Sequence, residues 1–392
     1  MKTILIPAFG LAVLLIYLYV ERRAIRRTLK TIPLRICVTG TRGKSTVTRL
    51  IAAALREAGY RVLAKTTGSK PVFIFPDGGE KEIERAGKPT ILEQKRVVGL
   101  ARDVHADALV VELMSIRPET MSVESPKILQ PRLLAITNVR LDHLDDMGRT
   151  KDEIAASLAA AIPSQGTVLV PEEEFYPVFQ RTSEGRGTRI VKIPSASGFE
   201  LGGREFPENT RLVLALAEIL NIPRDTALRG MAKARADFGG LKIWTARPEP
   251  LKGDWYLASA FAANEPESTG KVLALIRERF PRFPRKMIAL LNLREDRGDR
   301  TRQWLDALQT GFFDAFDELV FIGDHARALA RKKLSGPSSK TKISAWPSRR
   351  PDKIMEKIFS TKNEGSAIIG MGNMGGLGAD LVDYWSRIGA PL

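Results

Sequence analysis

The segment that most constrains the fold of this chain is residues 39–46, Thr-Gly-Thr-Arg-Gly-Lys-Ser-Thr. It follows the short apolar run LRICVT (34–39) and precedes apolar residues at helical spacing from Val47 to Ala58, after which Gly59 ends the pattern. A strand, a glycine-containing turn and a helix in this order predict a βα unit in which the amino terminus of the helix can bind a phosphate group. The sequence therefore predicts an α/β fold with a mostly parallel sheet.

Seven residues of this segment are candidates for binding nucleotide phosphates: Gly40, Thr41, Arg42, Gly43, Lys44, Ser45 and Thr46. Backbone N–H groups in a tight turn bind phosphate oxygens, and the two glycines permit such a turn. The Lys44 ammonium can reach the terminal phosphates of ATP, and the Ser45 hydroxyl can bind Mg²⁺. The usual pattern G-x-x-x-x-G-K-[ST] has its first glycine where this chain has Val38. The alternative is a tight strand–helix turn that binds nothing.

Two further strand ends carry polar side chains. Glu112 lies near the end of ALVVEL (108–113). Asn138 is the last residue of LLAITN (133–138), and His143 follows it. The carboxyl ends of parallel strands meet at one edge of a sheet, so we expect these residues to converge on the phosphate loop. Ser45, Glu112 and His143 are the predicted ligands of Mg²⁺ or Mn²⁺. Taken singly, Glu112 is equally well explained as a solvated strand-end carboxylate and His143 as a turn residue.

The rest of the chain repeats the alternation of strands and helices. Apolar runs at 286–293, 318–323 and 366–370 are separated by helical patterns, which is typical of a second, Rossmann-like unit. Periodicity breaks around residues 238–250, at FGG and RPEP. We therefore expect an amino-terminal segment of residues 1–30, an ATP-binding central domain of residues 31–243 and a carboxyl-terminal domain of residues 244–392.

The first thirty residues combine an uncharged run with a basic flank. Residues 3–20 carry no charge, and as a helix they would span ~27 Å, near the lower limit for crossing a bilayer. Five basic residues follow, Arg22, Arg23, Arg26, Arg27 and Lys30. This charge order predicts one transmembrane helix in the cell membrane, with the catalytic domains in the cytoplasm. The alternatives are a cleaved signal peptide and a basic flank that simply touches anionic lipids.

Charge and composition narrow the function further. The 392 residues carry a net charge of +16, which favours polyanionic neighbours, and Cys37 is the only cysteine, which excludes an intrachain disulfide. Aromatic residues make up 7% of the chain, and we find no helix-turn-helix, zinc or RNA-binding pattern. Nucleic acid is therefore not an expected partner.

The motifs together resemble those of the Mur ligase superfamily, which includes muramoyl-peptide ligases and folylpolyglutamate synthases. The resemblance is carried by G-T-x-G-K-[ST] at the loop, by the segment VVELMS and by TNVRLDHLD. In that superfamily the glutamate and the histidine of the last two segments are metal ligands, which implies this role for Glu112 and His143. Asn209 matches an asparagine that contacts the adenine region, although a helix cap would explain it equally well.

One branch is particularly similar, the ligase subunit of poly-γ-glutamate synthase. The segments that carry this resemblance are AKTTGSKP, VVELMSIRPE, ITNVRLDHLDDMG, ASAFAANEPEST, LNLREDRGDRT and GMGNMGG. It implies that ATP activates the γ-carboxylate of glutamate as an acyl phosphate, which an amine then attacks. Lys44, His143 and Arg294 are the implied catalytic residues. Thr67, Asn264, Asp296 and Arg297 are the implied substrate residues. Capsule-type polymer synthesis at the membrane with small integral-membrane partner subunits is also implied.

Some positions depart from the superfamily pattern. Many Mur ligases carry a carbamylated lysine fifteen residues after the motif histidine, where this chain has Leu158. Arg42 replaces a common asparagine, and AFAANEP lacks an aspartate and a histidine of the corresponding family segment. The competing functions are a folylpolyglutamate or peptidoglycan ligase, which shares the chemistry, and a membrane-tethered P-loop ATPase switch, which would need only the phosphate loop.

Overall fold

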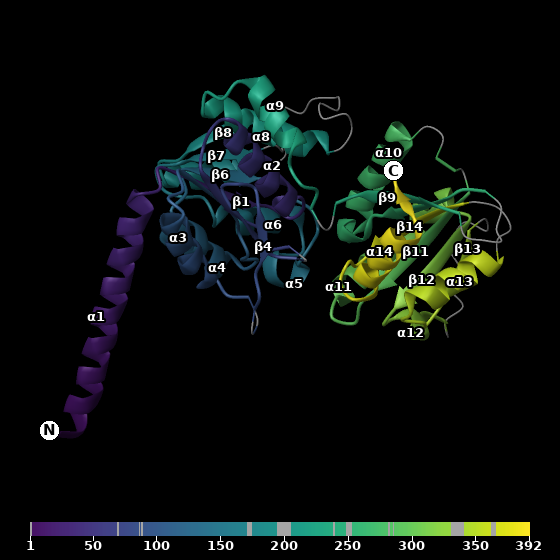
Figure 1. The fold of residues 1–392 in the computed structure, drawn as a ribbon. Helices are drawn as coiled ribbons and strands as arrows, with labels where there is room; N and C mark the ends of the chain where they lie inside the picture. The colour runs from purple at the N-terminus through teal and green to yellow at the C-terminus, as the bar shows by residue number, and fades with distance from the viewer. Residues whose placement is uncertain are drawn as a thin grey trace. The chain divides into compact units, whose positions relative to one another are not determined.

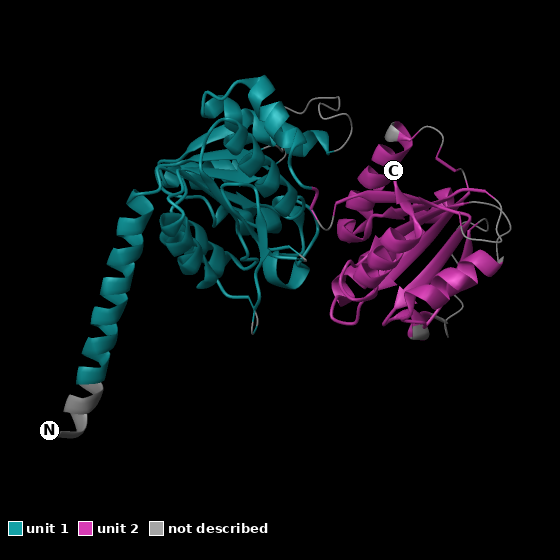
Figure 2. Ribbon diagram, in the orientation of Figure 1, with its two compact units in different colours: residues 1–235 teal, residues 236–392 magenta. Residues whose placement is uncertain are grey.

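The structure is a computed structural model that describes residues 2–68, 70–85, 87, 89–170, 175–193, 205–237, 240–247, 253–280, 283–284, 286–330, 341–361 and 366–392. The chain forms two compact units, Met1–Arg235 and Ala236–Leu392 (Figure 2). The predicted boundary at 243/244 falls inside strand β9 (Lys242–Ala246), which pairs with β10 (Trp255–Ser259) of the second unit. Residues 238, 239 and 248–250 of the predicted boundary region lie outside the described residues.

The first unit is built on an eight-stranded sheet in the order β4-β3-β2-β5-β1-β6-β7-β8 (Figure 1). Its central strands β2, β5, β1, β6, β7 and β8 are parallel, and β3 and β4 extend one edge antiparallel. The bounds are β1 (Leu34–Thr39), β2 (Val62–Lys65), β3 (Val72–Ile74), β4 (Glu80–Glu82), β5 (Ala108–Glu112), β6 (Leu133–Ile136), β7 (Thr167–Val170) and β8 (Arg189–Lys192). The predicted parallel sheet is confirmed.

Helices cover both faces of this sheet, which explains why its strands are almost uninterrupted apolar runs. In β1, Ile36 and Val38 pack with the helices α2, α8 and α9, while Cys37 faces the cluster around α3 and α6. The helices of this unit are α1 (Lys2–Lys30), α2 (Lys44–Glu57), α3 (Glu93–Asp103), α4 (Pro118–Val123), α5 (Leu144–Met147), α6 (Lys151–Ala159), α7 (Tyr176–Gly185), α8 (Pro207–Ile219) and α9 (Arg224–Ala232), with a π-helical turn at Glu124–Leu129.

The amino-terminal helix α1 extends away from the first unit and is joined to it at its carboxyl end (Figure 1). Where its side chains are described, the uncharged stretch runs from Phe9 to Val20 before Glu21 and Arg22 interrupt it. No helix among the described residues is long and apolar enough to cross a membrane. The prediction of a transmembrane helix is therefore not supported.

The second unit contains a seven-stranded sheet in the order β13-β12-β11-β14-β10-β9-β15. Five strands are parallel, and β9 and β15 continue the sheet antiparallel. Besides β9 and β10, the strands are β11 (Met287–Leu293), β12 (Glu318–Gly323), β13 (Lys342–Ala345), β14 (Ala367–Gly372) and β15 (Ala390–Pro391). The helices are α10 (Pro266–Arg279), α11 (Gly298–Gln309), α12 (Ala326–Ala330), α13 (Pro351–Thr361) and α14 (Leu377–Ile388). This is the predicted Rossmann-like architecture.

Candidate functional site

The strand order of the first unit brings the predicted site segments to one edge of the sheet. The strands β2, β5, β1 and β6 are neighbours in that order, and all four are parallel. Their carboxyl ends lead into Thr67, Glu112, the phosphate loop at 40–45 and Asn138, respectively. A sheet with this topology binds ligands at that edge.

The phosphate loop depends on two glycines with left-handed backbone. Gly40 has φ +124°, and a Cβ there would lie 2.1 Å from Thr137 Oγ1, far inside contact distance. Gly43 has φ +75° and caps the amino terminus of α2, and a Cβ there would lie 3.0 Å from Asn209 Oδ1. These close approaches explain why glycine stands at both positions. They also place Asn209, which is buried at the start of α8, directly against the loop.

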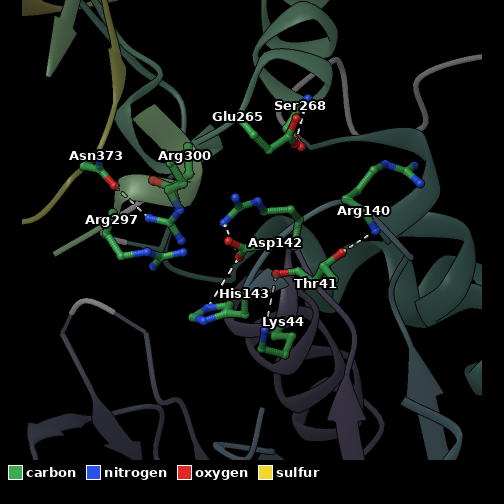
Figure 3. A network of polar contacts seen from close by, with 12 residues as sticks. Thr41, Lys44, Arg140, Asp142, His143, Glu265, Ser268, Arg297, Arg300 and Asn373 are labelled. Carbon is green, nitrogen blue, oxygen red and sulfur yellow. Dashed lines mark hydrogen bonds and ion pairs between the residues drawn. The ribbon is translucent and has the colours of Figure 1, made fainter. Parts of the chain in front are cut away.

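Two side chains, those of Asn138 and Lys44, form hydrogen bonds that hold the loop in shape. The Asn138 side chain accepts hydrogen bonds from Thr41 Oγ1 (2.7 Å) and Arg42 N (2.9 Å), and its Nδ2 donates to Arg42 O (3.1 Å). Lys44 Nζ donates to the carbonyl oxygens of Gly40 (2.8 Å) and Thr41 (3.3 Å), so its ammonium curls back over the loop (Figure 3). Thr46 lies in the first turn of α2 and is half-buried.

Ser45 and Glu112 form a polar pair beside the loop. Ser45 Oγ donates to Glu112 Oε2 across 2.8 Å, and the Thr67 backbone N–H donates to the same oxygen across 2.7 Å. The Glu112 side chain is only 2% exposed, and both of its partners among the described residues are neutral. A buried carboxylate normally has a cation beside it, so this pair fits a divalent metal ion with oxygen ligands.

His143 lies at the start of α5, beside Asp142. Its backbone is left-handed, with φ +50°, and its Nε2 lies 3.5 Å from Asp142 Oδ2 (Figure 3). The same Asp142 oxygen pairs with Arg42 Nη1 at 3.2 Å, and the Asp142 side chain is 2% exposed. No group of three or more His, Cys, Asp or Glu side chains placed to bind a metal occurs within the described residues. The role of His143 as a metal ligand stays a prediction.

A buried polar network behind the site was not predicted. Lys65, which is fully buried, pairs with Glu93 at 2.6 Å and donates to Gln94, which in turn donates to Glu124. Glu124 also accepts from the backbone N–H groups of Met114 and Ser115, just after Glu112. Burial lowers the pKa of Lys65 in spite of the ion pair with Glu93. The network therefore holds the segment that follows the site carboxylate.

In the second unit the predicted residues Arg294, Asp296 and Arg297 follow β11, and Asn264 follows β10. Arg294 forms a two-pronged ion pair with Asp296 (2.9 and 2.7 Å), and a Cβ on Gly375 would lie 2.1 Å from Arg294 Nη1. The segments LNLREDRGDRT and GMGNMGG therefore contact each other. Arg297 pairs with Asp299 at 3.4 Å. Burial alone would raise the pKa of Asp299, but the hydrogen bond from Arg297 brings it below its usual range.

Three further hydrogen bonds order residues of the quoted motifs in this unit. Arg300, which is buried, donates to Asn373 Oδ1 at 2.8 Å (Figure 3), and Asn292 Nδ2 donates to Asn373 O at 2.7 Å. Asn264 has left-handed backbone with φ +59°, and its carbonyl accepts from Trp304 Nε1 at 3.0 Å. Arg300 and Asn373 were not singled out from the sequence, although both lie in the quoted motifs.

Comparison with known proteins agrees with both halves of this description. Residues 38–208 match the Mur ligase middle domain, and residues 247–388 match the poly-gamma-glutamate synthase CapB C-terminal domain. The PGA synthase CapB of Bacillus subtilis is 32% identical over 380 residues, which cover 95% of each chain. The capsule biosynthesis protein CapB of Bacillus anthracis is 37% identical over 298 residues, covering 74% of this chain and 64% of the relative.

A solved structure supports the fold. The bifunctional folylpolyglutamate synthase/dihydrofolate synthase of Yersinia pestis, complexed with AMPPNP and a Mn ion, superposes with a TM-score of 0.67. The alignment covers 93% of this chain and 92% of that one at 15% identity. At this identity the similarity concerns the fold alone.

Proposed function

We propose that this chain, which belongs to the CapB family of poly-γ-glutamate synthases within the Mur ligase superfamily, uses ATP to join the γ-carboxylate of glutamate to an amine. The class of enzyme, an ATP-dependent carboxylate–amine ligase, follows from its relatives and from both domain matches. The observation that carries the proposal is the buried Glu112 carboxylate beside Ser45 at the phosphate loop. Glutamate as the substrate is supported by the relative named as a PGA synthase.

The chemistry requires two group transfers. A carboxylate oxygen attacks the terminal phosphorus of ATP, ADP departs, and an acyl phosphate forms. An amine nitrogen then attacks the acyl carbon, inorganic phosphate departs, and the nitrogen loses a proton to give the amide. The first step depends mainly on positioning and charge neutralisation. In this chain the loop N–H groups and the Lys44 ammonium would supply both, because they lie at the amino terminus of α2, where a phosphate group is favoured.

A divalent cation, Mg²⁺ or Mn²⁺, would be held by Ser45 and Glu112, with His143 as the predicted third ligand, and would neutralise phosphate charge. Arg42 adds a second positive group to the loop, and its ion pair with Asp142 fixes where the guanidinium lies. Asn209 is proposed to contact the adenine region, since it already rests against the loop at Gly43.

The carboxyl-terminal unit is proposed to supply the groups that bind glutamate and the growing chain. Arg294 and Arg297 can each grip a carboxylate, and Asp296 and Asp299 orient them. Asn264 and Thr67 complete the proposed substrate set. Positively charged residues suit a polymer that carries one carboxylate per unit, because opposite charges attract it to the protein.

The proposed location is the cytoplasmic face of the cell membrane, with small integral-membrane subunits as partners. The support is the exposed apolar stretch of α1 followed by its arginines. ATP is cytoplasmic, so a site that uses it must face that side.

The test is glutamate-dependent conversion of ATP to ADP by the full-length chain in membranes that also contain the partner subunits, with polymer measured in the same samples. Lys44→Ala should abolish both signals, and the exposed Lys127→Ala on the same unit should leave them intact. ATP hydrolysis that ignores glutamate and yields no polymer would instead indicate a nucleotide switch. Dependence on a pterin substrate would indicate a folate-type ligase.

A further inference from the structure

A basic cavity of about 710 Å³ lies where α1 meets the first unit. Seven of its lining residues are arginine or lysine, and none is aspartate or glutamate. Five come from α1, namely Arg22, Arg23, Arg26, Arg27 and Lys30, whereas Arg35 and Arg132 come from the amino-terminal ends of β1 and β6. The phosphate loop is at the carboxyl ends of the same strands, so this cavity is separate from the proposed active site.

The walls of the cavity are fixed by hydrogen bonds. Arg35 Nη1 donates to the carbonyl oxygens of Leu29 (2.9 Å) and Ile32 (2.7 Å), and its Nε donates to Gln130 O (2.9 Å). These bonds join the end of α1 to the start of the sheet. Burial, and then the charge of Arg132, lower the pKa of Arg35. The cavity thus brings positive charges together before any ligand arrives.

No carboxylate balances these charges within the described part of the chain. Glu21, the only acidic residue of α1, is paired with Lys95 of α3 at 2.6 Å. Arg22, Arg26, Arg27 and Arg132 are exposed and form no ion pair with any described residue. Like charges held close repel one another, so the arrangement is most stable with an anion between them.

The neighbouring surface indicates which anion. On the adjoining stretch of α1, large apolar and aromatic side chains from Phe9 to Val20 are 46–73% exposed. Tyr19, 62% exposed, also lines the cavity. An apolar stretch, then tyrosine, then arginine is the order of a membrane interface, where acyl chains give way to headgroups. A soluble polyanion as the ligand would not explain the exposed apolar stretch beside the cavity.

We propose that this cavity binds the phosphate headgroup of an anionic phospholipid, with Arg26 of α1 and Arg132 of the sheet on two sides of it. The contact goes beyond the ligase reaction and rests only on the proposed membrane location. It would set the orientation of the first unit on the membrane, because Arg132 belongs to the folded body and not to the helix.

The test uses the full-length chain in neutral detergent micelles, titrated with a short-chain phosphatidylglycerol, with phosphatidylcholine and with glycerol phosphate. The variant replaces Arg26 and Arg132 by glutamine. Neither of these arginines is among the residues whose hydrogen bonds hold α1 in place. The control replaces two exposed arginines elsewhere in this unit, Arg102 and Arg181. Arg132→Gln alone is a second variant that leaves α1 unchanged.

The expected result is a loss of phosphatidylglycerol affinity of about fivefold for each arginine removed from the cavity, with the control pair unchanged. Phosphatidylcholine affinity should stay the same in all variants. Equal losses in the control pair, no loss in the cavity variants, or equal affinity for glycerol phosphate would overturn the proposal. The proposal would also be overturned if the cavity variants lost affinity only for added poly-γ-glutamate, because the cavity would then bind the polymer. ATP turnover is not part of this readout, so the result is independent of the proposed reaction.

Discussion

Ser45 and Glu112 lie within one hydrogen bond of each other, 2.8 Å from Oγ to Oε2, although 67 residues separate them in the chain. Ser45 lies in the first turn of α2, which follows β1, and Glu112 ends β5. Because β1 and β5 are adjacent, the contact follows from strand order and not from local sequence. This hydroxyl and this buried carboxylate, at the start of α2, are the proposed ligands of a divalent metal ion.

Replacing Glu112 by glutamine tests the proposed metal site. The amide oxygen can still accept from Thr67 N, and removing a buried charge lowers the cost of burial, so the ligand-free protein should be as stable as the wild type or more so. Ligase activity should fall on the order of 10²-fold or more, since a group that neutralises transition-state charge is lost. Thermal unfolding with and without ATP and Mn²⁺ measures the stability, and glutamate-dependent conversion of ATP to ADP measures the activity. Glu119→Gln, an exposed change on α4, should alter neither.

Lys44 should matter for turnover and little for folding. Its ammonium donates to the carbonyl oxygens of Gly40 and Thr41, and water can solvate those oxygens when the side chain is shortened. We expect Lys44→Met to lower turnover on the order of 10²–10³-fold. Circular dichroism should show a native spectrum. A variant that keeps more than a tenth of wild-type turnover would contradict the role given to this lysine.

Gly40→Ala should damage the loop itself. The added Cβ would meet Thr137 at 2.1 Å with a backbone φ of +124°, so the free energy of unfolding should fall by about 1–3 kcal/mol. Nucleotide affinity should fall with it, as measured by calorimetric titration. The matched control is Gly99→Ala in α3, where a Cβ meets nothing within 4 Å. That change should raise stability by about 0.5–1 kcal/mol, because alanine favours a helix more than glycine does.

The Lys65–Glu93 pair predicts a dependence of stability on acid pH. Burial alone would raise the pKa of Glu93, but hydrogen bonds from Arg85 and Lys65 bring it down to about 2, below its usual 4.5. The stabilising contribution of Glu93 is therefore complete above about pH 4.5 and is lost as the pH falls toward 2.

Glu93→Gln should remove that part of the acid sensitivity and should cost about 3–5 kcal/mol at neutral pH, because Lys65 stays buried without its carboxylate. Urea unfolding followed by far-ultraviolet circular dichroism at pH 7 and pH 3 measures both. The exposed Glu82→Gln serves as the control. An unchanged pH dependence in Glu93→Gln would show that the pair does not contribute.

The sequence predicted the parallel strands well because their burial on both faces requires unbroken apolar runs. The expected strand 34–39 and the apolar run 318–323 coincide with β1 and β12. The strands β4 and β9 were not predicted. A three-residue edge strand and an antiparallel strand beside a polar segment both have a weak pattern of apolar residues. The same omission placed the domain boundary inside β9.

The strand-end argument found Ser45 and Glu112 because strand order decides that contact. It could not find the Arg42–Asp142 ion pair, since the direction of Asp142 depends on the turn before the left-handed His143. Nor could it find Lys65, because a lysine at the end of VLAK gives no sign of complete burial. Such features depend on tertiary packing around one residue.

The inward position of Cys37 on β1 has an experimental use. Burial raises the pKa of its thiol well above the usual range, so the folded chain should resist alkylating reagents. All five tryptophans, by contrast, lie beyond residue 243. Thiol labelling and indole fluorescence therefore act as native, unit-specific probes, one for the opening of each half of the enzyme, with no added tag.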